Sequence, residues 1–385
     1  MNKTIDKMTP FIVMDVLERA NQIQSEGIEV IHLEVGEPDF DTPDCVNQAI
    51  IKAQNNSKTH YTHSLGMPEL REEIADMYFR DYGVKVNPEC IVVTSGSSPA
   101  ILMTLMLLCN SGDEVIMSNP GYPCYKNFTL ACNAKPVFVD LNPENGFQYN
   151  IEDIKCKITD KTRAVFVNSP MNPTGGLMSA ETMKALCELT IPVISDEIYH
   201  GLVYGKKPHS MLEFSDNVFV INGFSKKYAM TGLRLGYVIA PEKHIRKLQI
   251  LQQNLFICAP STAQIGGIAA IRDAEKDVQR MLTVYDERRI YMLSRLKNMG
   301  FTVHAEPEGA FYIYCDARRF TNNSYNFVFD VLEKVHVGIT PGIDFGSNGE
   351  GFLRFSYANS IENIKAAMDK LEIYLKEKYG NNQIY

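Results

Sequence analysis

The chain has 385 residues, which is long for a single hydrophobic core and predicts two or three domains. Its hydrophobic fraction of 45% and charged fraction of 22% are typical of a soluble globular protein. The formal net charge is −8, the sequence contains no basic block, and no apolar run reaches the roughly 18 residues of a membrane span. These properties argue against a nucleic-acid-binding protein and against an integral membrane protein.

Cysteines and histidines are scattered along the sequence. The nine cysteines include no Cys-x-x-Cys pair, and residues 1–14 do not have the composition of a signal peptide. Such cysteines are expected to be reduced thiols, so a cytoplasmic protein is expected. The eight histidines lack the spacing of a metal site, and His60 and His63 are at best a pair, so no metal is expected.

The first expected elements are a helix and a strand. An amphipathic pattern over residues 13–26 predicts a helix that ends at Gly27. Residues 30–36 then predict a strand. Its last residue, Gly36, lets bare backbone approach a ligand closely, although a glycine that merely ends a strand explains the pattern equally well.

Tyr61 lies in the loop before a predicted turn and helix. Gly66 and Pro68 mark the turn, and residues that favour a helix follow them. An aromatic side chain on such a loop either packs against the fold or reaches a ligand. Tyr61 is therefore a candidate binding residue.

A possible phosphate cradle lies between a strand and a helix. Residues 90–93 predict the strand, the small residues 94–100 follow, and the helix is expected to run through Cys109. Free backbone amides and the positive end of the helix point the same way at such a turn, which favours an anion. The turn matches neither the dinucleotide fingerprint nor the P-loop, and many α/β turns look alike.

Two further strands end in proline-rich turns. The strand expected at 114–117 leads to Tyr122, whose ring lies next to a proline and suits stacking on a flat ligand ring, whereas Tyr125 is expected to pack. The strand expected at 163–168 leads to Asn172 in an Asn-Pro-Thr-Gly turn. Asparagines are common in such turns, so Asn172 gains weight only from its neighbours.

Asp196 follows a predicted buried strand at 192–195. A carboxylate at such a position is costly without a partner, and either a cationic ligand group or the cap of a following helix would supply one. Tyr199 would share its face if a helical turn begins here. Glu197 is expected on a solvated face.

The loop between the strands predicted at 218–222 and 237–240 carries a lysine and an arginine. Lys226 at the mouth of a strand suits a Schiff base with an aldehyde. Arg234 suits a phosphate dianion, because a guanidinium donates two parallel hydrogen bonds. An exposed lysine-rich loop is the alternative, because Lys227 follows Lys226 directly.

Arg354 is the last candidate residue. It lies in one of two strands predicted near the C-terminus, at 309–315 and 351–357, among apolar residues. A buried arginine needs an anion, which is either a ligand carboxylate or the partner of a structural ion pair.

Strands and helices alternate over residues 90–240, which predicts an α/β fold with a mostly parallel central sheet and helices on both faces. The candidate residues follow the strands of this sheet. Ligands bind α/β sheets at the carboxyl ends of the strands, so these residues are expected to meet in one site.

The stretch from Gly223 to Gly236, Gly-Phe-Ser-Lys-Lys-Tyr-Ala-Met-Thr-Gly-Leu-Arg-Leu-Gly, resembles the lysine motif of class I aminotransferases. These are pyridoxal 5′-phosphate (PLP) enzymes of fold type I, and the chain looks like their aspartate/alanine aminotransferase members. The other turns occur in the family's order. The resemblance implies a homodimer, a large PLP-binding domain at residues 40–275, and a smaller α+β domain made from residues 1–39 and 276–385.

The resemblance also assigns roles to residues. Lys226 would hold PLP and act as the base, Asp196 would keep the ring nitrogen protonated, and Tyr199 would act beside them. Arg354 and the Gly36 amide would bind the substrate carboxylate, with Tyr122 and Asn172 nearby. The full set expected to bind the cofactor is Gly96, Ser97, Ser98, Tyr122, Asn172, Asp196, Tyr199, Ser225, Lys226, Arg234 and, from the partner subunit, Tyr61.

Two positions depart from the family's pattern. Gly223 stands where a serine often touches the phosphate, and Ser97 or Ser98 would have to replace that contact. Ser98 also stands where prokaryotic aspartate enzymes often have a lysine for the second substrate carboxylate. The preferred amino acid is therefore open among aspartate, alanine and a broad range.

The implied activity is transfer of the amino group of an L-α-amino acid to a 2-oxo acid such as 2-oxoglutarate, by a ping-pong mechanism through pyridoxamine phosphate. A β-eliminating carbon–sulfur lyase on the same scaffold would share every cofactor residue. A non-enzymatic effector-binding module is the third possibility, but it should bring a DNA-binding domain, for which the N-terminus has no room. Small molecules are the expected partners, with no nucleic acid and no membrane.

Overall fold

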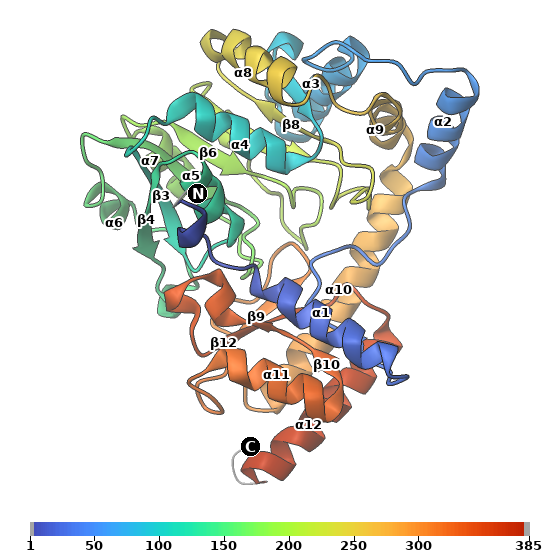
Figure 1. Ribbon diagram of the computed structural model, residues 1–385, viewed down its shortest axis with the longest axis vertical. Helices are drawn as coiled ribbons and strands as arrows, with labels where there is room; N and C mark the ends of the chain where they lie inside the picture. The colour runs from blue at the N-terminus through green and yellow to red at the C-terminus, as the bar shows by residue number, and fades with distance from the viewer. Residues whose placement is uncertain (1–3, 381–385) are drawn as a thin grey trace.

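The computed structural model describes residues 4–380, and its largest element is a seven-stranded sheet in the upper part of Figure 1. The order is β2-β8-β7-β6-β5-β3-β4, and β8 is the one strand antiparallel to its neighbours in this sheet. The strands are β2 (Ile91–Thr94), β3 (Glu114–Asn119), β4 (Lys135–Asp140), β5 (Thr162–Asn168), β6 (Val193–Asp196), β7 (Val218–Gly223) and β8 (Gly236–Ile239). The expected mostly parallel sheet is confirmed.

Helices cover both faces of this sheet. The side chains of its strands point alternately to the two faces, and they are apolar on both. Val92, Phe166 and Ile194 pack into one core cluster, whereas the neighbouring Val93 and Val193 pack into another. The first cluster includes residues of α4 (Ser97–Leu108), α5 (Cys124–Ala131) and α8 (Glu242–Leu255). The second includes residues of α3 (Pro68–Tyr82), α6 (Ile151–Lys155) and α7 (Ala180–Cys187). Continuous apolar runs are typical of strands buried on both faces.

Polar residues end three neighbouring parallel strands at the same edge. Asn119, Asn168 and Asp196 are the last residues of β3, β5 and β6, and Asn168 pairs with Asp196 in the sheet register. The carboxyl ends of parallel strands are the place where α/β sheets bind ligands. Most of the functional residues predicted from the sequence lie at this edge.

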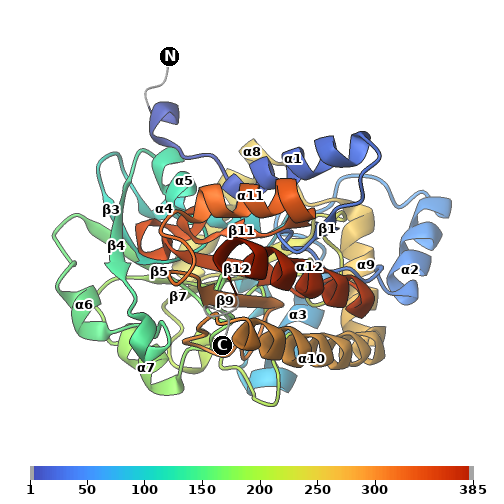
Figure 2. The same ribbon diagram turned by 90° about the horizontal axis from the view of Figure 1, so that it is seen from below.

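A second, smaller sheet lies below the first, with strands β11 (Thr340–Pro341), β12 (Phe352–Ser356) and β9 (Tyr312–Asp316) in antiparallel order. Figures 1 and 2 show the N-terminal helix α1 beside α11, so the two ends of the chain pack together. The helices of this part are α1 (Ile12–Ser25), α10 (Glu275–Asn298), α11 (Ser324–Val335) and α12 (Ile361–Tyr379). The remaining helices, α2 (Asp44–Asn55) and α9 (Ser261–Asp273), pack against each other.

The first strand is shorter than predicted. β1 comprises only Ile31–His32 and pairs with β10 (Val337–Gly338), so the prediction that it ends at Gly36 is wrong. Only two residues of β10 are available as partners, and the chain then leaves the sheet. Val35, Gly36 and Glu37 line a cavity instead.

Short 3₁₀ turns connect several elements, and none of the described helices is both long and apolar enough to cross a membrane. The 3₁₀ turns are η1 (Ile5–Lys7), η2 (Pro88–Cys90), η3 (Pro143–Asn145), η4 (Met211–Glu213), η5 (Gly342–Phe345) and η6 (Ser347–Gly349). Across residues 4–380, no group of three or more metal-ligating side chains comes together.

Candidate active site

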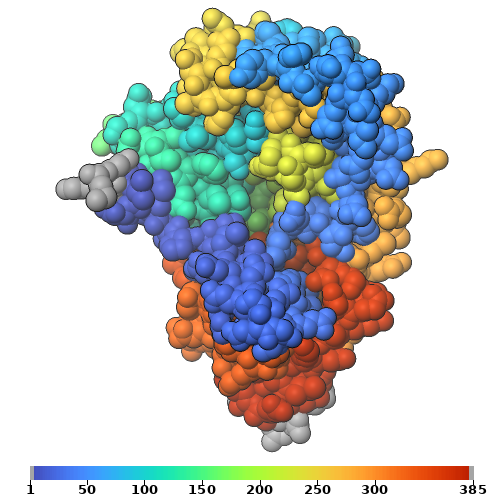
Figure 3. Space-filling model, turned by 45° about the vertical axis from the view of Figure 1, so that its right-hand side comes forward, coloured from blue at the N-terminus to red at the C-terminus, as the bar shows by residue number. Residues whose placement is uncertain are grey.

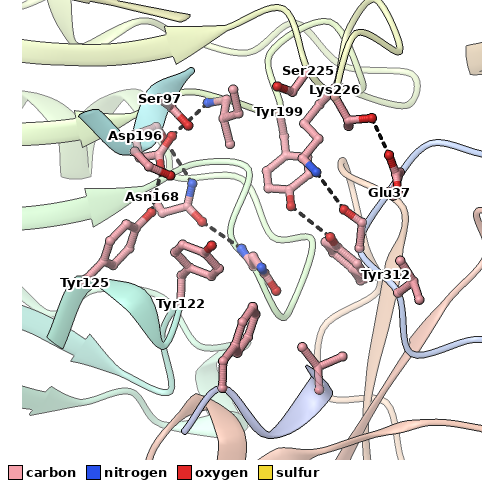
Figure 4. Close-up of a pocket in the computed structure, with 18 of the residues that line it drawn as sticks. Glu37, Ser97, Tyr122, Tyr125, Asn168, Asp196, Tyr199, Ser225, Lys226 and Tyr312 are labelled. Atoms are coloured by element: carbon pink, nitrogen blue, oxygen red, sulfur yellow. Dashed lines mark hydrogen bonds between the residues drawn. The ribbon is translucent and has the colours of Figure 1, made fainter. Parts of the chain in front are cut away.

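A cavity of about 340 Å³ opens at the carboxyl edge of the large sheet. Its lining comes from that edge, from α1, from residues 35–37 and from β9 and β12 of the smaller sheet. Figure 3 shows the surface hollowed between the yellow-green segment that follows β7 and the blue N-terminal segment. Segments far apart in the sequence therefore share one cavity, and Figure 4 shows how their side chains face one another.

Lys226 projects into this cavity from the turns after β7. Its Nζ donates a hydrogen bond to the Gly36 carbonyl at 2.6 Å. Burial lowers the pKa of Lys226 to about 8; the carboxylate of Glu37 opposes this shift, and the nearby Arg354 and Arg234 add to it. At neutral pH, a larger fraction of such an amine is unprotonated than of an ordinary lysine, and the unprotonated form is the one that acts as a nucleophile or base.

The neighbouring Lys227 points elsewhere. Its Nζ lies 3.6 Å from the Asp81 carboxylate, and its side chain packs against Gly201 in a separate hollow. The loop is therefore not an exposed lysine-rich segment, and only Lys226 of the pair lines the cavity.

Asp196 faces the cavity from the end of β6 with 4% of its surface exposed. Its carboxylate accepts hydrogen bonds from the Tyr125 hydroxyl at 2.6 Å and from the Ile198 amide at 3.0 Å. Burial raises the pKa of Asp196 to about 6. Turns follow this residue and no described helix starts there, so the helix-cap alternative is wrong.

Tyr125 was missed as a polar residue of the site. The predicted packing is present, because its ring stacks on Phe166 with centroids 4.0 Å apart. Its hydroxyl, however, is the one side-chain donor to Asp196 among the described residues. The sequence could have indicated this contact, since Tyr125 lies in the first turn of a helix that follows β3, at the same sheet edge as Asp196.

An anion cradle forms where α4 begins. Ser97 and Ser98 are the first two residues of this helix, and both line the cavity. Arg234 also lines it, with an exposed side chain whose Nη1 donates to the Thr231 carbonyl at 2.8 Å. Its guanidinium lies so close to Gly96 that a Cβ there would collide with it. Free amides at a helix start beside a guanidinium suit a phosphate.

Gly223 and Ser225 complete this side of the site. A Cβ at Gly223 would lie 3.0 Å from the Leu235 carbonyl oxygen and 3.2 Å from the Gly236 Cα, so close packing of β7 on β8 explains the glycine. Ser225 is buried and lines the cavity next to Lys226.

Arg354 reaches the cavity from β12 and is only 2% exposed. Its Nη1 donates to Asn172 Oδ1 at 3.0 Å, and its Nη2 donates to the Glu34 carbonyl at 2.6 Å. Its Nε has no hydrogen-bond partner, and no carboxylate of residues 4–380 forms an ion pair with it. The structural ion pair considered from the sequence is therefore not found. A buried guanidinium without a counterion favours binding of an anion.

Aromatic residues form another part of the lining. The hydroxyls of Tyr199 and Tyr312 lie 2.9 Å apart (Figure 4). Tyr122 contacts Phe11 edge to face with ring centroids 6.0 Å apart. Tyr312 and Glu37 also line the cavity but were not predicted. They come from the two ends of the chain, and no local pattern in the sequence distinguishes them.

Tyr61 is not brought to this cavity within one chain. Its side chain is 81% exposed, and it is absent from the lining. All the other predicted site residues except Gly96, which lies behind Arg234, contribute to the cavity directly.

The expectation for Glu197 was wrong. Its side chain is fully buried and accepts hydrogen bonds from the Ser210 hydroxyl at 3.1 Å and the Met211 amide at 2.9 Å. Burial raises the pKa of Glu197 to about 8. The segment around Ser210 folds over this carboxylate, and the local sequence after β6 does not reveal that cover.

Known proteins similar to this chain agree with the geometry. The model of the family described as aminotransferase class I and II matches residues 28–371. The chain is 41% identical over 381 residues to a (5-formylfuran-3-yl)methyl phosphate transaminase of Methanocaldococcus jannaschii, covering 98% of this chain and 100% of the relative. It is 36% identical over 368 residues to an aspartate aminotransferase of Pyrococcus horikoshii, covering 94% and 93%.

A solved structure is similar over the same length. A crystal structure from Methanococcus jannaschii, described as similar in its active site to kynurenine aminotransferases, matches with a TM-score of 0.91. Its sequence is 41% identical, and the match covers 97% of this chain and 100% of that one. The fold predicted from the sequence, fold type I, is confirmed by this likeness.

Proposed function

Because this chain belongs to the class I and II aminotransferases and is therefore a transferase, we propose that it uses PLP to move the amino group of an L-α-amino acid to a 2-oxo acid such as 2-oxoglutarate. The observation that carries the proposal is the meeting of Lys226, Asp196 and Arg354 in one cavity. PLP supplies an electron-withdrawing ring and carries the amino group, as pyridoxamine phosphate, between the two half-reactions of a ping-pong mechanism.

The residues present fit this cofactor. Lys226 offers an amine with a depressed pKa for a covalent link to the aldehyde. Asp196 offers a buried carboxylate to a ring N–H, and Arg234 offers a guanidinium to a phosphate. The residues we propose to surround these three are Gly96, Ser97, Ser98 and Ser225 at the phosphate, Tyr122 at the ring face, and Asn172 and Tyr199 at the phenolic oxygen.

The chain's own groups would divide the work of the reaction. Arg354 would hold the substrate α-carboxylate with its two outer nitrogens, assisted by the Gly36 amide, and so fix the direction of the Cα–H bond. Lys226 Nζ, once free, would take the proton from Cα. Asp196, with a pKa of about 6, is mostly ionised at pH 7 and would keep the ring nitrogen of the cofactor protonated.

The first prediction concerns the half-reaction. Holoenzyme mixed with an amino acid alone should convert its cofactor from the aldehyde to the amine form and release an equal amount of 2-oxo acid. Absorbance of the cofactor and chromatography of the products measure both. The panel of acceptors should include 2-oxoglutarate, pyruvate and, because of the name of the M. jannaschii relative, (5-formylfuran-3-yl)methyl phosphate. Continuous release of pyruvate and ammonia from a cysteine conjugate without an acceptor would indicate a lyase instead.

The second prediction concerns Tyr125. Its hydrogen bond is one of the interactions that lower the pKa of Asp196 against the effect of burial, so Tyr125→Phe should raise that pKa above about 6. Asp196 then loses charge near neutral pH. The acidic limb of the pH–activity profile should move to higher pH, and affinity for PLP should fall about tenfold. An unchanged profile would exclude this role. Phe166→Leu, which alters only the stacking partner, is the control.

We also propose a homodimer with shared sites and a division of the chain into domains. Residues 40–275 would form the large domain, and residues 1–39 and 276–385 the smaller one; residues 1–3 and 381–385 lie outside the described part. The two sheets support this division, since one lies wholly within 91–239 and the other within 312–356. The exposed Tyr61 supports the dimer, because a partner's phosphate is a suitable target for its hydroxyl.

The third prediction tests the shared site. Tyr61→Ala and Lys226→Ala are each expected to be nearly inactive. If Tyr61 serves the partner, a heterodimer of the two has one site with both lesions and one site with neither. Exchanged mixtures should then recover about half of the native activity per heterodimer. A mixture of Lys226→Ala with Asp196→Ala is the control, because both residues line the same chain's cavity and no activity should return. No recovery with Tyr61→Ala, despite proven subunit exchange, would contradict the shared site.

A further inference from the structure

Few charged side chains line the cavity. Its described lining contains three cations, Lys226, Arg234 and Arg354, and two carboxylates, Glu37 and Asp196. Under the function proposed above, each cation already has a partner: the cofactor's aldehyde, the cofactor's phosphate and the substrate's α-carboxylate. No cation of the lining that this chain supplies remains for a second carboxylate on the substrate, and Tyr61, the residue proposed to come from the partner subunit, brings no positive charge.

One wall of the cavity, next to Tyr122, is apolar, and α1 supplies it. Phe11, Val13, Met14 and Leu17 line the cavity from the first turns of this helix. The only basic residue of α1, Arg19, is bound elsewhere: its Nη2 donates to Glu333 at 2.9 Å.

The smaller domain fixes the position of this helix. Asp344 of η5 accepts hydrogen bonds from the backbone amides of Ile12 at 2.8 Å and Val13 at 3.2 Å, and so caps the start of α1 from outside. The ring of Phe11 rests edge to face on Tyr122. The apolar wall is therefore held against the ring face of the site and is not a loose end of the chain.

Glu37 adds a charge that opposes an acidic substrate. It lines the cavity, and its carboxylate accepts a hydrogen bond from the Thr231 hydroxyl. A substrate with a carboxylate side chain would bring a second negative charge close to Glu37, which is exposed and forms no ion pair within residues 4–380, and against the apolar wall of α1. The substrate's carboxylate would lose water against that wall without gaining a cationic partner, which is disfavoured.

From this arrangement we infer that the amino donor has an uncharged, mainly apolar side chain and that α1 is the element that selects it. The inference rests on the proposed aminotransferase function and names its substrate class. Because donor and acceptor enter the same cavity in turn, a neutral 2-oxo acid such as pyruvate should then be a better acceptor than 2-oxoglutarate. Neutral donors should react about 10- to 100-fold faster than acidic donors of the same size, as kcat/KM of the first half-reaction.

The experiment compares matched pairs of donors on the holoenzyme in single turnover. Methionine is paired with glutamate, which has a similar length, and asparagine with aspartate, which differs from it in charge at nearly constant shape. Binding is measured separately with α-methyl-leucine and α-methyl-aspartate, which lack the Cα hydrogen, by the thermal shift of the holoenzyme. A larger shift with α-methyl-leucine is expected. Acidic donors that react as fast as their neutral partners would overturn the inference, whereas failure of every donor would instead overturn the proposed function.

A pair of variants tests the role of α1. Met14 lines the cavity but is 52% exposed, so it tolerates a polar replacement. Met14→Lys places a cation on the wall and should raise the glutamate-to-methionine ratio of kcat/KM about tenfold. Met14→Gln has a similar length without charge and should leave the ratio close to that of the native enzyme. Circular dichroism verifies that both fold. A ratio that Met14→Lys does not change would show that α1 does not face the substrate side chain.

Discussion

Replacement of Lys226 by alanine is expected to reduce kcat by at least about a thousandfold, because one side chain serves both as covalent anchor and as base. Its Nζ is held in the cavity by the Gly36 carbonyl, and burial lowers its pKa to about 8. At pH 7 roughly a tenth of such amines are unprotonated, against fewer than about one in a thousand for an ordinary lysine. Single-turnover kinetics with a fast donor measures the loss.

The pH dependence of cofactor attachment gives an independent reading of the same residue. Attachment requires the neutral amine, so its rate should rise with pH up to about 8 and level off above it. Reduction of the holoenzyme with borohydride should fix the cofactor on Lys226. Lys227→Ala is the matched control, because Lys227 faces Asp81. This substitution should leave turnover within about twofold of the native enzyme. Label on Lys227, or no label on any lysine, would contradict the proposed anchor.

The fold and most of the site could be predicted because of how parallel strands are buried. Each central strand is a run of apolar residues, and the polar residues that follow it, such as Asn168 and Asp196, meet at one edge. Local order in the sequence was therefore enough to place Asn172, Asp196 and Lys226 in one cavity.

The missed features depend on contacts between distant segments. Tyr125 reaches Asp196 across 71 residues, and Tyr199 reaches Tyr312 across 113. The same holds for the cover over Glu197, which comes from a segment that has no strand of the sheet. A hydrophobic pattern predicts which face of an element is buried, but it does not predict which distant side chain will meet a given polar atom.

Asp196→Asn should lower kcat/KM by about a hundred- to a thousandfold without loss of the fold. Asparagine keeps the shape and can still accept a hydrogen bond from the Ile198 amide, but it has no negative charge to hold a proton on the cofactor's ring nitrogen. Steady-state kinetics measures the loss, and the absorbance of bound cofactor reports whether binding persists. A variant with native kcat/KM would exclude the proposed role of Asp196.

The same substitution, Asp196→Asn, should stabilise the cofactor-free protein although it lowers activity. The folded-state pKa of Asp196 is raised to about 6 from 3.8, so its protonated form stabilises the fold. That contribution is present below about pH 4 and is lost as pH rises through 6; a shift of about two pKa units corresponds to about 3 kcal/mol. Without cofactor, Asp196→Asn should therefore melt at a higher temperature than the native chain at pH 7.5, and the difference should shrink toward pH 4.5. PLP should remove the native chain's disadvantage, because a ring N–H then pairs with the carboxylate. A difference in melting temperature that does not depend on pH would contradict the raised pKa of Asp196 and its proposed pairing with a ring N–H.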